Sequence, residues 1–246
     1  AGKGKKWKDI KSEAEKKATF QFPWDTGDYG IYAWRLDDEN GRLLTDNDSF
    51  AQDTTVYAVT NYTNFTWSGT KITGVTGEKP RGKIIIPARC TEIGNDAFLS
   101  AGQMTQVRLP GNLTSIGERA FTYCSSLQQV DFSSCTDLTS IGKSAFADCK
   151  DLQQVNLFRC SALTSIGEYA FNGCTALQEV DLSLCTHLTK ISKGTFFSCN
   201  KLKRVEFPRD LTAIEEKAFD FCTDLTQADF SGCTKPVSYT HLTLPT

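Results

Sequence analysis

Residues 127–135 read LQQVDFSSC, and the same phrase returns as LQQVNLFRC at 152–160 and as LQEVDLSLC at 177–185. Looser copies begin at Met104, Leu202 and Leu225, which brings the number of copies to six. Each copy alternates apolar and polar residues, as a strand with one buried face does. Repetition at a fixed period indicates stacked units that share one continuous core, so the sequence predicts a solenoid.

A second constant phrase joins these strand segments. It reads LTSIGERAFTYC at 113–124, and equivalent copies occupy 90–101, 138–149, 163–174, 188–199 and 211–222. Together the two phrases follow the leucine-rich-repeat pattern L-x-x-L-x-L-x-x-N/C. We therefore expect an α/β-type repeat solenoid, a leucine-rich-repeat horseshoe with one short parallel strand per coil of 23–25 residues, preceded by a small β-rich module.

Two apolar columns of the linking phrase are expected to form the core of the stack. The sequence predicts an aromatic spine of Phe121, Phe146, Phe171, Phe196 and Phe219. It predicts a second row of Ile116, Ile141, Ile166, Ile191 and Ile214. One coil cannot bury its own apolar row, but a stack can, and each such side chain contributes about 1.5–3 kcal/mol when fully buried. The run IIIP at 84–87 predicts an extra leading strand.

The expected domains are a short helix or linker at 1–18, a small β-rich spacer at 19–74, the solenoid at 75–234 and a non-repeat tail at 235–246. Apolar residues at Trp7, Ile10 and Ala14 suit the helix, whose lysines we interpret as a solvated face. The strands expected before the solenoid are 19–22, 29–35 and 54–60, followed by an extended stretch at 64–75.

The two ends of the chain suggest a piece of a longer protein. The chain starts at Ala1, and its one methionine, Met104, lies inside a repeat, so the lack of a signal peptide says little about location. The tail 235–246 follows no repeat column, because Pro236 stands where the next leucine is due. It resembles the translated adaptor sequence that can terminate assembled gene fragments. The alternative interpretation is a genuine cap or linker.

Composition and motifs exclude several classes of function. A formal charge of −2 and a pI near 5.8 argue against nucleic acid as the main partner. No stretch approaches the roughly 20 apolar residues that insertion into a membrane requires. The only histidines are His187 and His241, so no cysteine or serine has an evident base, and we expect no enzyme and no cofactor. His187 is interpreted as a surface loop residue. Residues 45–49 lack the glycine and distal glutamate of a calcium loop and read as a turn.

Most of the ten cysteines follow the repeat. One column holds Cys124, Cys149, Cys174, Cys199 and Cys222, another holds Cys135, Cys160, Cys185 and Cys233, and Cys90 replaces a repeat leucine. The absence of C-x-x-C argues against zinc. Disulfides are possible by count, but side chains stacked on parallel strands about 4.8 Å apart point the same way. The favoured interpretation is small, buried, reduced thiols.

The residues between the apolar positions of each strand are expected to point outward, on the concave face. They form a polar, mostly acidic strip that should favour a basic partner, although ordinary solvation of a sheet face explains it about as well. Phe158 stands out because its equivalents are serines, and it is a candidate anchor. The candidate ligand-binding residues are Gln129, Asp131, Gln154, Asn156, Phe158, Glu179, Asp181, Arg204, Glu206 and Asp229. 

A column in the linking phrase offers a contrast, because its charges alternate in sign. It consists of Glu118, Lys143, Glu168, Lys193 and Glu216. Neighbouring coils can therefore pair their charges, although exposed pairs of this kind contribute only about 0–1 kcal/mol each. We interpret this column as structural.

Residues 81–234 resemble the BspA-like leucine-rich repeats of bacterial surface proteins and some protist ones. The phrase IGERAFTYCSSLQQV at 116–130 and its later equivalents carry the resemblance. Residues 19–61 are similar to the β-grasp module called the Listeria–Bacteroides repeat, through YAW at 32–34, DENG at 38–41 and DTTVYAV at 53–59, although the tryptophan neighbourhood departs from that module.

The first resemblance implies display at the cell surface and adhesion to host matrix proteins or to other cells, without a catalytic site. The second implies a spacer in a multidomain surface protein. Two hypotheses follow. The chain is a non-enzymatic module that binds a protein ligand, such as a host extracellular-matrix protein, through the concave strand face. Alternatively, it is a structural spacer or stalk with no ligand of its own. Fold alone does not choose between them.

Overall fold

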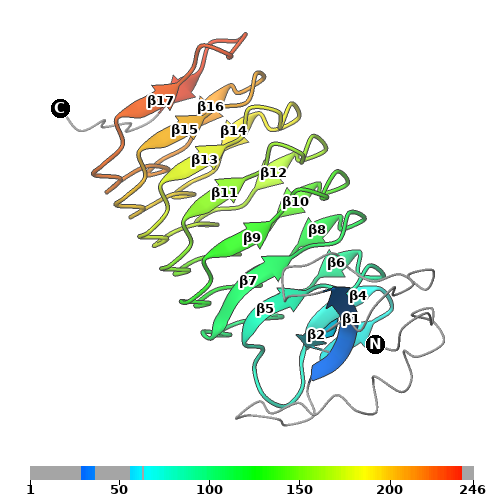
Figure 1. Ribbon diagram of the computed structural model, residues 1–246. Coiled ribbons are helices and arrows are strands. Elements are labelled where there is room, and N and C mark those ends of the chain that lie inside the picture. The colour runs from blue at the N-terminus through cyan, green and yellow to red at the C-terminus, as the bar shows by residue number, and fades with distance from the viewer. Residues whose placement is uncertain (1–28, 37–55, 63, 240–246) are drawn as a thin grey trace. The chain divides into compact units, whose positions relative to one another are not determined.

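The computed structural model describes residues 29–36, 56–62 and 64–239 (Figure 1). The chain divides into two compact units, Ala1–Asn64 and Phe65–Thr246. In the first unit, β1 (Tyr29–Leu36) pairs antiparallel with β2 (Val56–Tyr62), with Tyr29 opposite Tyr62. Both strands lie where the alternating sequence predicts them. The helix expected at 1–18 and the strand expected at 19–22 lie outside the described residues.

The second unit is a solenoid, and its strand phrases form one parallel sheet of seven strands (Figure 1). The strands of this long sheet are β5 (Gly82–Ile85), β7 (Met104–Arg108), β9 (Gln129–Asp131), β11 (Gln154–Asn156), β13 (Glu179–Asp181), β15 (Arg204–Glu206) and β17 (Gln227–Asp229). They stack in sequence order, so each coil pairs with its neighbours in the chain. The predicted leading strand is confirmed as β5, which pairs with β7.

The linking phrases contribute a second strand to every coil. These short strands are β6 (Glu92–Ile93), β8 (Ser115–Ile116), β10 (Ser140–Ile141), β12 (Ser165–Ile166), β14 (Lys190–Ile191) and β16 (Ala213–Ile214). They form parallel sheets on a second side of the solenoid, which we call the short-strand side. One such sheet ends at β12 and another starts at β14.

The expectation of an α/β solenoid with one strand per coil is therefore wrong in two respects. Each coil has two strands, and residues 29–36, 56–62 and 64–239 contain no helix, so the fold is a β-solenoid. The third side of each coil, which we call the turn side, consists of successive turns. There, residues such as Arg119 and Tyr123 adopt left-handed φ angles of 52° and 61°. Isolated left-handed residues interrupt the right-handed path that a helix needs.

At both ends of the solenoid, additional strands extend the sheets of the short-strand side. At the start, β3 (Phe65–Ser68) and β4 (Lys71–Val75) form a hairpin, and β4 pairs in parallel with β6. The boundary between the units thus falls after Asn64, whereas the sequence analysis placed it after residue 74. At the other end, β18 (Ser238–Tyr239) pairs with β16, in a tail that was expected to follow no repeat column.

The predicted aromatic spine is confirmed in the core. The rings of Phe121, Phe146, Phe171, Phe196 and Phe219 stack in order, and Phe98 extends the row by one coil. Adjacent ring centroids lie 5.0–5.5 Å apart, with interplanar angles of 1–17°. The isoleucine row is also buried, at the inward positions of the short strands. Because each coil adds the same two side chains, the core is continuous along the stack.

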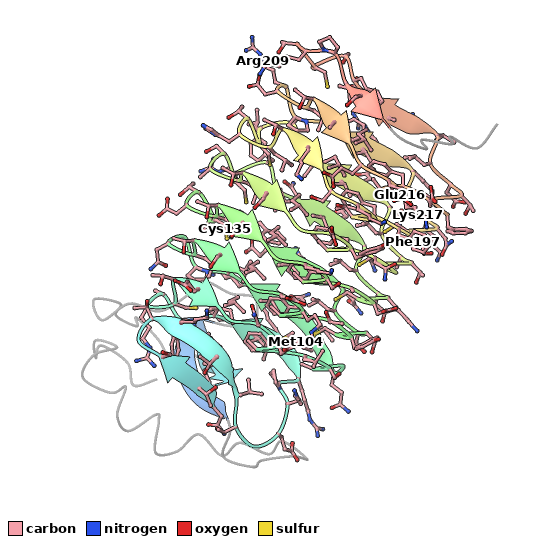
Figure 2. All side chains as sticks on the ribbon, turned by 180° about the vertical axis from the view of Figure 1, so that it is seen from behind. Met104, Cys135, Phe197, Arg209, Glu216 and Lys217 are labelled. Carbon is pink, nitrogen blue, oxygen red and sulfur yellow. The ribbon has the colours of Figure 1, made fainter. Side chains whose placement is uncertain are left out.

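The expectation that the cysteines are buried is confirmed for nine of them, whereas Cys233 is half-buried. All ten are free thiols in the structure. In one column each thiol donates a hydrogen bond to the carbonyl of a spine phenylalanine in the preceding coil; Cys149 Sγ, for example, lies 3.2 Å from Phe121 O. Burial raises the pKa of Cys124 to about 12, so that thiol stays protonated near neutral pH. Met104, at a leucine position, is likewise fully buried (Figure 2).

Candidate ligand-binding face

The register of the long sheet brings the candidate residues together on one side of the solenoid. Gln154 lies beside Glu179 and Asn156 beside Asp181, and the next step pairs Glu179 with Arg204 and Asp181 with Glu206. The same columns run on through Gln129 toward β7 and through Asp229 at β17. This outward surface of the long sheet, together with the turns that follow its strands, is called the long-strand face. All ten candidates lie on it, with Asp131, Asp181 and Glu206 half-buried and the rest exposed.

The column that contains Asp131, Asn156, Asp181 and Asp229 also stabilises the turns after the strands, a role that the sequence alone did not suggest. Asp131 Oδ1 accepts a hydrogen bond from Ser133 N at 2.9 Å, and Asp229 Oδ1 accepts one from Ser231 N at 2.8 Å. Asn156 makes the same contact with Phe158 N at 3.1 Å. Aspartate and asparagine close such turns through the backbone amide two residues later. The signal was present in the sequence, because every one of these turns begins with Asp or Asn.

Hydrogen bonding within these turns shifts the titration of two carboxylates. At Asp229 the hydrogen bonds from Ser231 lower the pKa below its usual range. At Asp131 burial alone would raise the pKa, but hydrogen bonds from Ser133 and the charges of Arg108 and Lys83 bring it below the usual range. Both groups are therefore negatively charged at neutral pH and can attract a cation.

Charge compensation varies along the face. At one end Arg108 Nε lies 3.9 Å from Asp131 Oδ2, and at the other Arg204 Nη2 lies 2.8 Å from Glu206 Oε1. Within the part of the chain that the structure describes, no cationic side chain forms an ion pair with Glu179 or with Asp181. The strand β13, in the middle of the face, thus carries two carboxylates that remain available to a partner.

Two exposed apolar side chains accompany those carboxylates. Phe158 keeps 41% of its surface exposed in the turn after β11, and Leu184 keeps 45% exposed in the turn after β13. Their coils are neighbours, because β11 pairs directly with β13. Leu184 was missed by sequence reasoning, although it stands where the other long coils have Ser134 and Arg159. Glu179, Asp181, Phe158 and Leu184 together are called the central patch.

The described residues contain no group of three or more His, Cys, Asp and Glu side chains that could hold a metal ion. His187 is exposed, as predicted, and its Nδ1 lies 2.9 Å from Ser161 O. No helix among the described residues has the length and apolar character needed to cross a bilayer.

The repeat phrases match a known family over most of the chain. The model of the BspA type leucine rich repeat region matches in six copies, over residues 80–182 and 139–240. The chain belongs to the BspA-type leucine-rich repeat family. The resemblance seen in the sequence is thereby confirmed for the solenoid, whereas the similarity of residues 19–61 to the Listeria–Bacteroides repeat stays a prediction. No protein among the curated ones matches.

One solved structure supports the leucine-rich-repeat solenoid fold, and others are similar to this chain at lower TM-scores. A leucine-rich repeat protein from Eubacterium ventriosum is similar with a TM-score of 0.59 and 21% identity, over 76% of this chain and 50% of that one. A leucine-rich repeat protein from T. pallidum matches with a TM-score of 0.49 and 23% identity, over 66% and 88% of the two chains. A leucine rich cell surface protein from Faecalibacterium prausnitzii matches with a TM-score of 0.22 and 18% identity, over 85% and 96%. The chain spans half the length of the E. ventriosum protein.

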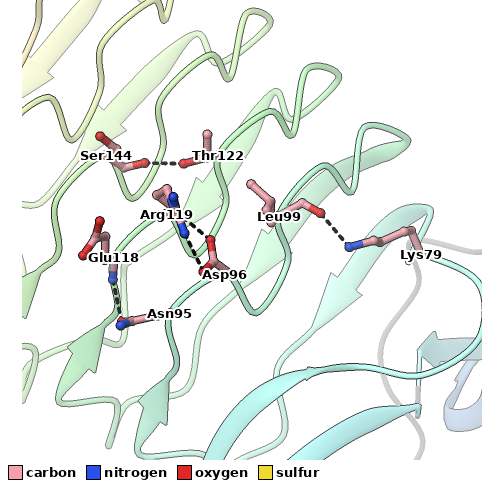
Figure 3. Close-up of polar contacts among 8 residues, drawn as sticks. All are labelled: Lys79, Asn95, Asp96, Leu99, Glu118, Arg119, Thr122 and Ser144. Carbon is pink, nitrogen blue, oxygen red and sulfur yellow. Dashed lines mark hydrogen bonds and ion pairs between the residues drawn. The ribbon is translucent and has the colours of Figure 1, made fainter.

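The turn side of this BspA-type solenoid has ion pairs and hydrogen bonds between neighbouring coils. Arg119 and Asp96 form a two-point ion pair between coils, with nitrogen–oxygen distances of 2.8 and 2.9 Å (Figure 3). Backbone-directed contacts lie beside it, such as the bond from Glu118 N to Asn95 Oδ1 at 2.9 Å. Here the side chains satisfy one another from coil to coil.

The alternating charge column behaves in the same way. Lys143 Nζ lies 3.2 Å from Glu168 Oε2, and Lys193 Nζ lies 2.8 Å from Glu216 Oε2, which confirms that neighbouring coils pair their charges (Figure 2 labels Glu216). The hydrogen bond that Lys193 donates to Glu216 raises the pKa of Lys193. The central patch differs from these two ion pairs, because its carboxylates have no cationic partner among the described residues.

Proposed function

We propose that this chain is a non-enzymatic protein-binding module of a bacterial cell-surface protein, and that it engages its ligand through the long-strand face. The central patch is the observation that carries the proposal. It combines carboxylates without a cationic partner on β13 with two exposed apolar side chains in the turns after β11 and β13. Exposed apolar groups next to uncompensated charge are typical of a surface that is covered by a partner.

The chemistry of the patch defines the partner that fits it. A protein segment with a lysine or arginine beside an apolar side chain would place its charge against Glu179 or Asp181 and its apolar group over Phe158 or Leu184. Complementary charge speeds association, and burial of the apolar contact slows dissociation. Host extracellular-matrix proteins and proteins of other cells are the ligands that the family resemblance suggests.

A structural spacer without a ligand is the second candidate, and one observation favours it. The acidic column closes the turns after the strands, so its recurrence has an explanation that involves no partner. That explanation covers Asp131, Asp181 and Asp229 but not Glu179, Phe158 or Leu184. The two functions therefore differ in what the central patch does.

Surface plasmon resonance on the full chain against a panel of extracellular-matrix proteins tests the proposal. The decisive variant combines Glu179→Gln, Asp181→Asn and Phe158→Ser, because asparagine already closes a turn at Asn156 and serine occupies the position of Phe158 in the other coils. We expect saturable binding that weakens at least tenfold in this variant. The matched control, Glu118→Gln with Glu168→Gln, removes two charges from the other columns and should bind normally. Binding that is equally strong in both variants would assign the ligand to a surface other than the central patch, and binding to no member of the panel would favour the spacer.

A further inference from the structure

The short-strand side is interrupted at one step of the solenoid. At most steps a threonine amide donates to the threonine carbonyl of the preceding coil, as Thr139 N does to Thr114 O and Thr164 N to Thr139 O, both at 2.9 Å. The pattern resumes with Thr212 N and Thr189 O at 2.7 Å. Between β12 and β14 the described residues show neither this bond, which would join Thr189 to Thr164, nor a strand pairing. We call this interruption the seam.

The seam coincides with a departure from the repeat. Four coils place glycine after the isoleucine of the short strand, and a Cβ on Gly167 would lie 2.5 Å from the backbone nitrogen of Lys143. A Cβ on Gly142 would lie 2.6 Å from the carbonyl carbon of Gly117. At these two steps the close approach of the backbones requires glycine. The coil of β14 has Ser192 at this position, over Gly167, and the pairing is lost there, whereas the coil of β16 has Glu215 and still pairs with β14.

The serine side chain partly replaces what the seam removes. In the preceding step Gly167 N donates to Ile141 O at 2.8 Å. At the seam, the hydroxyl of Ser192 donates a hydrogen bond to the equivalent acceptor, Ile166 O, at 2.6 Å. A side-chain hydroxyl thus occupies the place of a backbone amide, and the two coils are joined here through a rotatable group.

The other two sides of the solenoid stay connected across the same step. On the long sheet, β11 and β13 pair over all three of their residues. On the turn side, Tyr169 N donates to Lys193 O at 2.9 Å and Phe171 N to Thr195 O at 2.9 Å. The ring of Tyr169 also lies directly over the Cα of Gly194, where a Cβ would collide with it. The two coils therefore stay hydrogen-bonded on the long sheet and on the turn side, whereas their short strands do not pair.

We propose that the seam is a hinge, at which the solenoid flexes by opening and closing its short-strand side about the long sheet. The position of the hinge matters for the central patch, which spans the same two coils. Phe158 belongs to the coil of β11 and β12, whereas Leu184 belongs to the coil of β13 and β14. The seam lies between these two coils, so flexing changes the angle between the two apolar members of the central patch. This consequence rests on the proposed binding function, whereas the hinge itself does not.

Amide hydrogen exchange on the full chain, read residue by residue by NMR, tests the hinge without any ligand. We expect the amides of Thr189 and Ser192 to exchange at least tenfold faster than those of Thr164 and Gly167, because backbone groups freed from a sheet lose protection. Ser192→Gly should restore the close approach and slow exchange at Thr189 to the level of Thr164. Equal protection of Thr189 and Thr164 in the unmodified chain would overturn the hinge.

A matched substitution in another coil provides the control. Gly142→Ser places the same side chain over Gly117 and should free the amide of Thr139 in the way that Thr189 is free. Should this variant fail to fold, the comparison of the unmodified chain with Ser192→Gly still decides the outcome. For a ligand found in the matrix panel, Ser192→Gly should change the affinity at least threefold. An unchanged affinity would separate the hinge from binding, and an absence of any ligand would overturn the proposed function while leaving the exchange result intact.

Discussion

The carboxylate of Asp181 accepts two hydrogen bonds from Ser183, at 2.9 Å from the backbone nitrogen and 2.7 Å from the hydroxyl. Asp181 therefore contributes both to the turn after β13 and to the charge of the central patch. These two contributions can be separated, because asparagine closes the corresponding turn at Asn156.

Asp181→Asn should keep the turn and leave the free energy of unfolding within about 0.5 kcal/mol of the unmodified chain, as surface changes usually do. Asp181→Ala should lower it by about 1–3 kcal/mol, because the amide and hydroxyl of Ser183 lose their acceptor. Urea denaturation followed by circular dichroism measures both values. Equal stability of the two variants would mean that the turn does not depend on this side chain.

The aromatic spine should be the most sensitive part of the core. Phe146 stacks between Phe121 and Phe171, with centroid distances of 5.0 and 5.2 Å, and is fully buried. Phe146→Ala should destabilise the chain by about 3–5 kcal/mol, through lost burial and the cavity that remains. Phe158→Ala serves as the control, because that ring is exposed and should cost less than about 0.5 kcal/mol. Thermal unfolding of the two variants in parallel would show the difference.

The sequence predicted the columns of this fold because a repeat turns one local preference into many aligned copies. Phe121 and its equivalents, for example, had to share an environment once the period was known. The short strands were missed because a pair such as Ser115–Ile116 is too short to show alternation. The turns after them were read as part of an α/β coil because nothing in ERAFTYC indicates left-handed residues at Arg119 and Tyr123.

The candidate face was predicted in outline for the same reason, since alternation decides which side chains point outward. Its energetics depend on individual side-chain contacts that the repeat does not encode. The ion pair between Arg204 and Glu206 depends on the conformations of two side chains on one strand. The contact of Asp131 with Ser133 depends on the geometry of a single turn. By contrast, the exposure of Leu184 and the glycine replaced at Ser192 are both departures from the column, and such departures are readable in the sequence.

The buried thiols predict a loss of stability in alkaline solution. Burial raises the pKa of Cys124 and of Cys222 from 9.0 to about 12 in the folded chain. Between these values the unfolded chain releases protons that the folded chain retains, so stability is unaffected below pH 9 and falls as pH rises toward 12. Each such thiol adds about 1.4 kcal/mol per pH unit to the slope.

Urea midpoints measured at pH 7, 9 and 10.5 check this dependence. Tyrosine and lysine also titrate in this range, so the control is the double variant Cys124→Ala with Cys222→Ala. Alanine cannot ionise, and the double variant should therefore lose less stability than the unmodified chain between pH 9 and pH 10.5. Parallel curves for the two proteins would show that these thiols ionise equally easily in the folded state.

The contact between Tyr169 and Gly194 predicts a strong coupling between two coils. Gly194 has a φ of 60°, and its Cα lies under the tyrosine ring, which also packs edge-to-face against Phe197 with 6.5 Å between centroids. Gly194→Ser alone should destabilise the chain by about 1–3 kcal/mol, because the new side chain both adopts a left-handed conformation and displaces the ring.

The double variant Tyr169→Ser with Gly194→Ser tests whether the ring is the cause. Serine already occupies the equivalent left-handed position at Ser144, with a φ of 51°, so the backbone itself tolerates this residue. Removing the ring should therefore recover most of the stability that Gly194→Ser loses, giving an interaction energy of about 0.5–3 kcal/mol in the double-mutant cycle. Strictly additive losses would assign the cost to the backbone conformation and would remove Tyr169 as the side chain that requires glycine at this position.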